Sequence, residues 1–295
     1  MQVLRRPLPY RSLFLKGKDM DSDLLAVAVI TDAFPRKADW QRLRELLREA
    51  KGRGAVLAVL PELPLNPWSP VSKVAREEDA EDLNGPRQTC FSDAASETGL
   101  ALLGGAIIRD PDTGTRHNTA LLYDSSGSCL ARYRKVHLPE EEGYWETSHY
   151  EPGETPPPVA DGLSFRLGLQ ICSDVNRPSG FQLLSAMGAE VVLAPRCTPR
   201  ETYPRWRLIL RANAITSATY VISTNRPPQA GESLMGGPSL VVDPFGEVIL
   251  ETTDPLAMVS LRRETVRAAR VEYPGYLRMY PDLYAQGWKQ VGEGQ

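Results

Sequence analysis

LSFRLGLQICSDVNRPSG, from Leu163 to Gly180, combines an apolar run with a reactive side chain at its end. The run from Leu163 to Ile171 predicts a buried strand, which stops at Cys172 before a polar segment and Pro178. The ends of strands hold the chemistry of open α/β sheets. A free cysteine is also one of the most buried residue types and often only fills space. Cys172 therefore needs partners elsewhere in the chain before it counts as functional.

Length and charge restrict the class of protein. The chain has 295 residues, enough for one large α/β domain, and its 34 basic and 37 acidic residues give a formal net charge of -3. Nucleic acids and anionic membranes are bound by concentrated basic surfaces, which this balance disfavours. We therefore expect a small-molecule partner, with no nucleic acid and no membrane. The first residues do not form a signal peptide, so reduced thiols and a cytoplasmic location are expected.

The cysteines do not follow a metal-binding pattern. They are widely separated, no CxxC pair occurs, and no histidine spacing accompanies them. We expect neither a metal site nor another cofactor. The four positions are Cys90, Cys129, Cys172 and Cys197.

The order of the predicted elements is that of an α/β domain. Residues 1–23 are polar and are expected to form an N-terminal extension, in which Met20 is an alternative start. Residues 24–265 are expected to form one domain, and residues 266–295 a tail that contacts another subunit, since the tail is rich in tyrosine and arginine. Strands are predicted at 24–30, 55–60, 101–110, 117–124, 163–171 and 190–195, helices at 40–50 (capped by Asp39), 83–99, 181–188 and 204–216, and a hairpin at 236–252.

Two other predicted strands also end in polar side chains. Glu62 follows the strand at 55–60 and lies between two prolines, and Arg196 and Cys197 follow the strand at 190–195. A long irregular segment, 131–154, is too aromatic for a disordered linker, and long ordered loops on α/β scaffolds are often functional. It contains Lys135 and Glu146, which by themselves are compatible with ordinary surface charges.

Several chemistries can be compared by residue type. A phosphate-binding loop is disfavoured, because the glycine pair at 104–105 lies inside a predicted strand and not after one. A glycosidase-like carboxylate pair could come from Glu62 and Glu146, but such pairs are common. A cysteine–histidine pair would need an imidazole at a strand end with an orienting partner, which the sequence does not indicate for His117, His137 or His149.

A thiol activated by a carboxylate and assisted by an ammonium group fits the chain better. The carboxylate removes the thiol proton, and the cation stabilises the oxyanion formed when sulfur attacks a carbonyl carbon. Glu62, Lys135 and Cys172 would supply these three groups.

Three motifs carry a family resemblance. LPE (60–62), YRKVHLP (133–139) and ICSD (171–174) occur in the order seen in the nitrilase superfamily, the carbon-nitrogen hydrolases, and resemble its Glu-Lys-Cys triad. GYWE (143–146) puts Glu146 where that family has a second active-site glutamate. The resemblance extends over residues 24–284. It implies that Glu62, Lys135, Cys172 and Glu146 are catalytic.

The resemblance also implies an architecture and a reaction. The expected fold is a four-layer αββα sandwich in one domain, with a C-terminal oligomerisation tail and subunits that associate as homo-oligomers through their helical layers. The expected reaction is hydrolysis of a small amide or N-carbamoyl compound through a thioester on Cys172, without a cofactor. Nitrile hydrolysis, acyl transfer from the same thioester and a non-catalytic scaffold are the alternatives.

Departures from the family pattern concern the substrate. Ser173 stands where amidase and carbamoyl-type members commonly have an aromatic residue, and Asn176 stands where they have arginine, with Arg177 one place later. True nitrilases usually have tryptophan and glutamate directly after the cysteine, so a nitrile substrate is disfavoured. The spacing of Lys135 and Glu146 resembles the N-carbamoyl branch most. The predicted pocket-wall residues are Ser173, Asn176, Tyr144, Trp145, Arg196 and Cys197.

Overall fold

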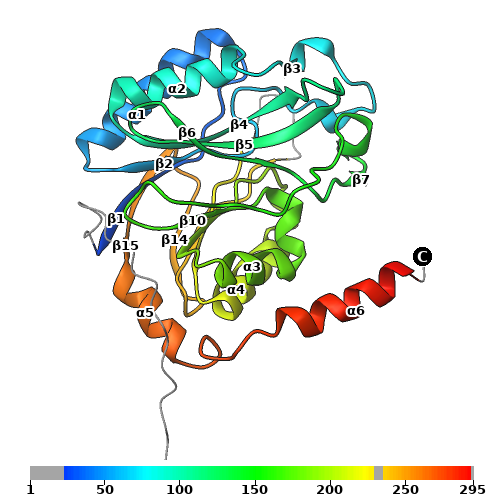
Figure 1. Ribbon diagram of the computed structural model, residues 1–295. Coiled ribbons are helices and arrows are strands. Elements are labelled where there is room, and N and C mark those ends of the chain that lie inside the picture. Colours follow the sequence, from blue (N-terminus) through cyan, green and yellow to red (C-terminus); the bar gives the residue numbers. More distant parts are fainter. Residues whose placement is uncertain (1–22, 229–234, 294–295) are drawn as a thin grey trace, which may run out of the picture.

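The computed structural model describes residues 23–228 and 235–293. The expected N-terminal extension and the alternative start at Met20 therefore lie outside the described residues, apart from residue 23. Two sheets face each other, and helices cover their outer faces (Figure 1). This arrangement confirms the predicted four-layer αββα sandwich.

The first sheet contains both ends of the core domain. Its order is β15-β1-β2-β4-β5-β6, and β3 pairs with β4. The first strand, β1, lies between antiparallel β15 and parallel β2, and four of its residues, 27–30, are fully buried. The strands are β1 (Leu24–Ile30), β2 (Leu57–Val59), β3 (Ala80–Glu81), β4 (Ala101–Arg109), β5 (Arg116–Tyr123), β6 (Cys129–Arg134) and β15 (Leu256–Arg262).

The second sheet carries the stretch around Cys172. Its order is β14-β13-β12-β11-β10-β9, with β10, β11 and β12 parallel. The predicted hairpin is confirmed as β13 and β14, joined by a turn in which Gly246 has a φ of 83°. The strands are β9 (Val159–Ala160), β10 (Leu167–Leu169), β11 (Val191–Leu193), β12 (Tyr220–Ser223), β13 (Ser239–Val242) and β14 (Val248–Thr252).

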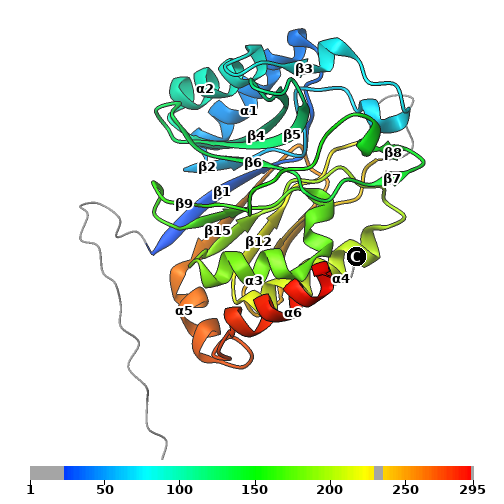
Figure 2. The same ribbon diagram turned by 45° about the vertical axis from the view of Figure 1, so that its right-hand side comes forward.

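The helices form the two outer layers (Figure 2). Helices α1 (Trp40–Gly52) and α2 (Pro86–Thr98) pack on the first sheet, and α3 (Pro178–Ala186) and α4 (Tyr203–Ser217) pack on the second. On α1 the residues that face the sheet recur at helical spacing and are buried: Leu43, Leu46, Leu47 and Ala50. A third apolar cluster fills the space between the sheets and includes Cys172. Burial from both sides explains why these strands read as continuous apolar runs.

Two local predictions were wrong. The strand expected at 163–171 is only β10, because the segment before it does not join the ladder: the backbone N–H of Arg166 donates instead to Glu190 Oε2 at 3.0 Å. Asp39 precedes α1 as predicted, but its carboxylate does not cap the helix. It pairs with Arg36 instead, with Nη2 and Oδ1 2.8 Å apart.

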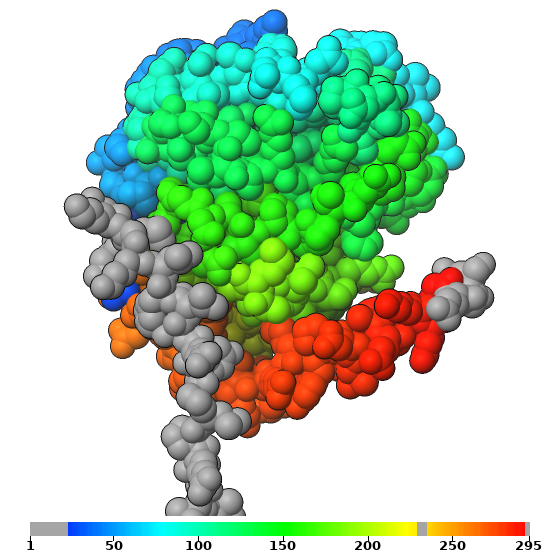
Figure 3. All heavy atoms as spheres, in the orientation of Figure 1, coloured from blue at the N-terminus to red at the C-terminus, as the bar shows by residue number. Residues whose placement is uncertain are grey.

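The segment 131–154 and the C-terminal tail have more structure than their sequences indicate. The former starts inside β6 and continues through a small hairpin, β7 (Glu140–Glu141) and β8 (Tyr144–Trp145). The tail forms two helices, α5 (Arg263–Val271) and α6 (Pro281–Glu293). Helix α5 crosses the expected boundary at residue 265, and Val266 packs into the core between the sheets. Among the described residues, the C-terminal end of α6 projects from the body (Figure 3).

No helix among residues 23–228 and 235–293 is long and apolar enough to cross a membrane.

Candidate active site

Cys172 stands at the point where β10 leaves the second sheet. It is the first residue of a short 3-10 helix, Cys172–Asn176, and its φ is 46°. Its backbone N–H donates to Pro195 O at 2.9 Å. A positive φ is uncommon for a residue with a side chain and persists only where the surroundings enforce it. The nucleophile candidate is thus held in a strained turn at a strand end, and it is only 4% exposed.

Glu62 follows β2 of the opposite sheet and has one oxygen fixed and one free. Its Oε1 accepts hydrogen bonds from Asn118 Nδ2 at 2.8 Å and Lys135 Nζ at 2.9 Å. Its Oε2 is buried and has no hydrogen-bond partner among the described residues. A carboxylate that is oriented through one oxygen keeps the other available to accept a proton, as a general base requires.

Lys135 follows β6 and joins two carboxylates. Besides Glu62, its Nζ donates to Glu146 Oε1 at 2.7 Å and Oε2 at 2.8 Å. Burial acts to lower the pKa of the ammonium group, but the charges of Glu146 and Glu62 raise that pKa well above its ordinary value. Lys135 therefore stays charged although it is fully buried.

Glu146 is equally buried, at the start of the 3-10 helix Glu146–Ser148. Burial raises the pKa of its carboxyl to about 7, although the charge of Lys135 opposes this shift. The structure thus brings together all four predicted catalytic side chains, from both sheets and from the segment 131–154. Two carboxylates share a single ammonium group beside the thiol.

Burial is also the largest influence on the Cys172 thiol, and Glu62 adds to it. Together they raise the pKa of the thiol well above its ordinary value, although Lys135 acts in the opposite direction. The resting thiol is therefore protonated. Since the thiolate is the nucleophile, such a site needs a base to remove the proton.

A Glu146→Gln variant should lose part of the pH dependence of stability. The pKa of Glu146 is about 7 in the folded protein against an ordinary 4.5, so the folded state binds more protons between these values. Its contribution to the free energy of unfolding consequently falls as pH rises from about 4.5 to 7. Urea unfolding at several pH values should show the wild type losing stability relative to the variant over this range. A difference that is constant with pH would contradict the shift.

Asp174 connects the turn of Cys172 to the segment of Lys135. Its Oδ1 accepts the backbone N–H of His137 at 2.9 Å, and its Oδ2 accepts Tyr133 Oη at 2.9 Å and the backbone N–H of Ile171 at 3.3 Å. This carboxylate is 1% exposed. The sequence contained it in the ICSD motif, but gave no sign of the partners it joins.

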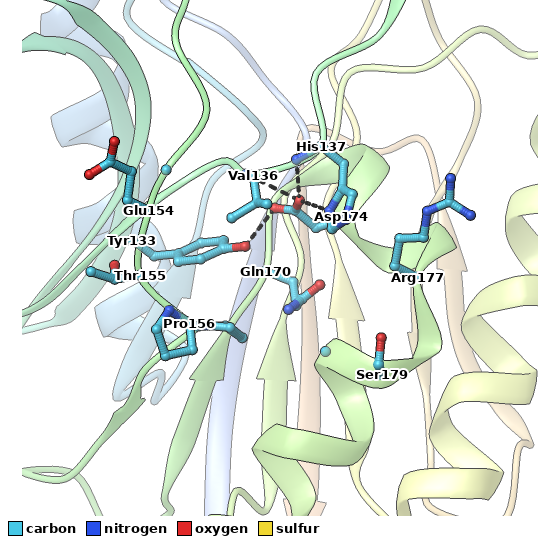
Figure 4. A pocket seen from close by; sticks show the side chains of 13 residues that line it. Tyr133, Val136, His137, Glu154, Thr155, Pro156, Gln170, Asp174, Arg177 and Ser179 are labelled. Carbon is cyan, nitrogen blue, oxygen red and sulfur yellow. Dashed lines mark hydrogen bonds and ion pairs between the residues drawn. The ribbon is translucent and has the colours of Figure 1, made fainter. Parts of the chain in front are cut away.

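The expectation that no histidine has an orienting partner is wrong for His137. Its Nδ1 lies 2.7 Å from Asp174 Oδ1, on the edge of a cavity of about 270 Å³ next to the turn (Figure 4). The partner lies 37 residues away in sequence. The principal charges acting on the Cys172 thiol are nevertheless those of Glu62, Lys135 and Glu146. Glu62 is therefore the better candidate for the base of this thiol.

An apolar wall lies beside the four predicted catalytic side chains. It consists of Trp68, Tyr144, Cys197 and Met235. Tyr144 Oη donates to Met235 Sδ at 3.4 Å, and Cys197 Sγ lies 3.2 Å from the same sulfur. The charges of Glu62 and of a Cys172 thiolate act on Cys197. Two predicted pocket residues, Tyr144 and Cys197, therefore lie near the thiol. The wall also contains Trp68 and Met235, which no sequence pattern indicates.

The other predicted pocket residues have different surroundings. Ser173 Oγ donates to His137 O, Asn176 is exposed, and Trp145 is half-buried with Lys73 Nζ 4.0 Å from its ring centroid. Arg196 is fully buried, and its Nε donates to Ser223 Oγ at 3.0 Å. Burial lowers the pKa of the Arg196 guanidinium to about 10, although the charge of a Cys172 thiolate opposes this shift.

Among the residues that the structure describes, no group of three or more His, Cys, Asp or Glu side chains could hold a metal ion.

Comparisons with known proteins agree on the family. The carbon-nitrogen hydrolase model matches residues 24–271. Deaminated glutathione amidase of Mus musculus is 31% identical over 300 residues, which cover 96% of this chain and 92% of that protein. The structure of Saccharomyces cerevisiae Nit3, a member of branch 10 of the nitrilase superfamily, has a TM-score of 0.76 at 24% identity and covers 88% of this chain and 97% of its own.

A further solved structure shares the fold. It is a mutant amidase from Nesterenkonia sp. AN1, with a TM-score of 0.68 and 26% identity, covering 81% of this chain and 92% of that chain. Its active-site cysteine carries the product of Michael addition of acrylamide.

The two facing sheets and the buried thiol with its carboxylates and ammonium group define an α/β-sandwich enzyme. The chain belongs to the carbon-nitrogen hydrolase family, within the nitrilase superfamily.

Proposed function

We propose that the chain hydrolyses the C–N bond of a small amide through a thioester on Cys172. The supporting observation is the pairing of a protonated thiol with a glutamate that has one fixed and one free oxygen. The name of the mouse relative, an amidase, supports the same bond type.

In the first half of the reaction, Glu62 Oε2 takes the proton from Cys172 as the sulfur attacks the carbonyl carbon. Lys135 and the backbone N–H of Ser173 stabilise the oxyanion, because a fixed cation and an N–H group both offset the charge that develops on the carbonyl oxygen. The C–N bond then breaks, and Glu62 returns the proton to the departing ammonia or amine. The product of this half is the thioester, with all protons accounted for.

In the second half, a water molecule gives a proton to Glu62 as the water oxygen attacks the thioester carbon. The C–S bond breaks, the thiol regains the proton, and the carboxylic acid leaves. Glu146 holds Lys135 from the side opposite Glu62, so that the ammonium group keeps its position in both halves.

The substrate is an amide or ureido compound rather than a nitrile. Within this proposal the N-carbamoyl preference rests on the spacing of Lys135 and Glu146 alone, whereas the amide is also supported by the relatives' names. The apolar wall favours an uncharged acyl group, because apolar side chains cannot compensate the desolvation of a charge.

An activity screen would test the function. Purified protein is incubated with aliphatic amides, ureido acids, ureido amines and nitriles, and released ammonia is measured. Turnover of amides alone supports the proposal, and turnover of nitriles alone refutes it. Adding a primary amine separates hydrolysis from acyl transfer, because a transferase would form the substituted amide at the expense of the acid.

We also propose that the chain forms a homo-oligomer in the cytoplasm, with α6 seated on a second copy. Residues 281–292 of α6 are all exposed, although they include large apolar side chains. A 13-residue helix without packing is marginal in water. In Figure 1 its C-terminal end extends away from the body. The apolar side chains are Leu283, Tyr284, Trp288 and Val291.

A chain ending at residue 272 should therefore form an assembly of fewer subunits than the full chain does. It keeps α5, whose Val266 packs in the core, so the body should still fold. Light scattering after size exclusion measures the mass, and far-UV circular dichroism verifies folding. The same oligomer in both chains would show that α6 does not hold the subunits together.

A further inference from the structure

Arg226 is a fully buried cation that reaches from one sheet to the other. It follows β12 in the second sheet, and its backbone N–H donates to Arg196 O at 3.2 Å. Its Nη1 donates to Leu63 O at 2.7 Å and lies 3.4 Å from Glu62 O, and its Nη2 donates to Asn66 O at 3.0 Å. The guanidinium thus holds the segment that follows β2 in the first sheet.

The cation is compensated by neutral carbonyl groups. None of the carboxylates in the described residues forms an ion pair with Arg226, and its Nε has no hydrogen-bond partner there. A guanidinium remains charged in proteins, and its burial is costly unless fixed dipoles replace water. Three backbone carbonyls directed at one planar group supply such dipoles and leave it little freedom to move.

The segment that Arg226 holds has an unusual backbone. Leu63, next to Glu62, has a φ of 47°, a conformation that side chains disfavour. Gly105 of β4 lies against it, since a Cβ at that glycine would be 3.5 Å from Leu63 N and 3.3 Å from Thr119 O. Nη1 bonds the carbonyls of Glu62 and Leu63. It therefore stabilises this turn and fixes the backbone at Glu62.

We propose that Arg226 is a positioning residue for Glu62. It holds the segment of the base from the sheet that carries Cys172, so that the free Oε2 of Glu62 stays within reach of the thiol proton. This inference rests on the proposed function, because it gives Glu62 the role of base. Misplacement of a reacting group by about 1 Å can cost about 10²-fold in rate.

The test is a double-mutant cycle between Arg226 and Glu62. The rate of Cys172 alkylation by acrylamide at pH 7, followed by mass spectrometry, reports thiol activation and stays measurable without turnover. Glu62→Gln and Arg226→Met should each slow alkylation by about 10-fold or more. The double variant should be within about twofold of Glu62→Gln, because Arg226 acts only through the glutamate. If the fold reductions in alkylation rate of the two single variants multiply in the double variant, the inference is overturned.

Turnover supplies a second readout. Arg226→Met should lower kcat by about 10²-fold and change KM by less than about threefold, since a positioning residue of the base acts on the chemical step rather than on substrate binding. Arg226→Lys keeps the charge but not the planar fork, so its kcat should lie between those of the wild type and Arg226→Met. If Arg226→Met does not fold, the cycle is completed with Arg226→Lys, and multiplying losses again refute the role.

Arg196→Met is the matched control. Arg196 is equally buried, and its backbone pairs with Asn225, the residue before Arg226, in an isolated parallel bridge. Its guanidinium, however, bonds Ser223, Thr198 and Pro238 and not the Glu62 segment. Its effect on alkylation should multiply with that of Glu62→Gln. The two failures remain distinguishable: wild-type alkylation and turnover in Glu62→Gln refute the proposed base, whereas a slow Glu62→Gln with multiplying Arg226 losses refutes only the positioning role.

Discussion

Replacing Cys172 by alanine should reduce amide turnover by at least about 10⁴-fold, because the only nucleophile of the proposed reaction is lost. The substitution removes one sulfur atom from a buried position, so the fold should persist. Ammonia release measures turnover. Intact-mass spectrometry of wild-type protein quenched during turnover should show an acyl adduct on Cys172, which the variant cannot form.

Cys90→Ala is the control for this experiment. Cys90 is also a buried thiol, 2% exposed, and burial raises its pKa to about 11, but it lies on α2 in the outer core of the first sheet. Its removal should leave kcat within about twofold of the wild type. Retained turnover in Cys172→Ala, or an adduct on Cys90, would exclude Cys172 as the nucleophile.

Replacing Lys135 by methionine should affect both stability and activity. The variant leaves Glu62 and Glu146 buried without a cation, which is expected to cost about 3–5 kcal/mol at pH 8. The cost should be smaller at pH 5, because burial raises the pKa of Glu146 to about 7, so that this carboxyl is then neutral. kcat should fall by at least about 10²-fold, since the oxyanion loses its charged donor.

Urea unfolding at pH 5 and pH 8 tests this expectation. Lys51→Met serves as control, because Lys51 is exposed and donates only to Gly99 O, at 2.7 Å. The control should cost less than about 1 kcal/mol at either pH. An equal loss at pH 5 and pH 8 in Lys135→Met would show that the two carboxylates do not depend on this ammonium group.

Two of the proposed catalytic side chains could be located from the sequence because each follows an element with a clear pattern. Glu62 and Cys172 come directly after short apolar runs, and such runs predict buried strands, at whose ends α/β proteins hold their chemistry. Lys135 and Glu146 lie in a segment without periodicity. Only the order of the motifs indicated them, through the family resemblance.

The partners of these side chains could not be predicted in the same way. Asn118 bonds Glu62 across 56 residues, and Asp174 bonds His137 across 37 residues. An asparagine inside an apolar strand, 117–124, was a visible signal, but its partner depends on which strands become neighbours. The tail showed no clear periodicity, yet it forms α5 and α6; Val266 of α5 packs into the core, which can outweigh a weak sequence signal, whereas α6 has no such packing.

The sequence by itself determined the doubly covered strands, the order of the three motifs and hence the residue types available for catalysis, since these depend on local periodicity and spacing. Only the tertiary structure decided that Glu62 keeps one oxygen free, that Arg196 is fully buried, and that Arg226 bonds a segment 160–164 residues away. These facts depend on how the two sheets face each other. Hydrogen bonds between the sheets require the packed core, whose geometry no local pattern encodes.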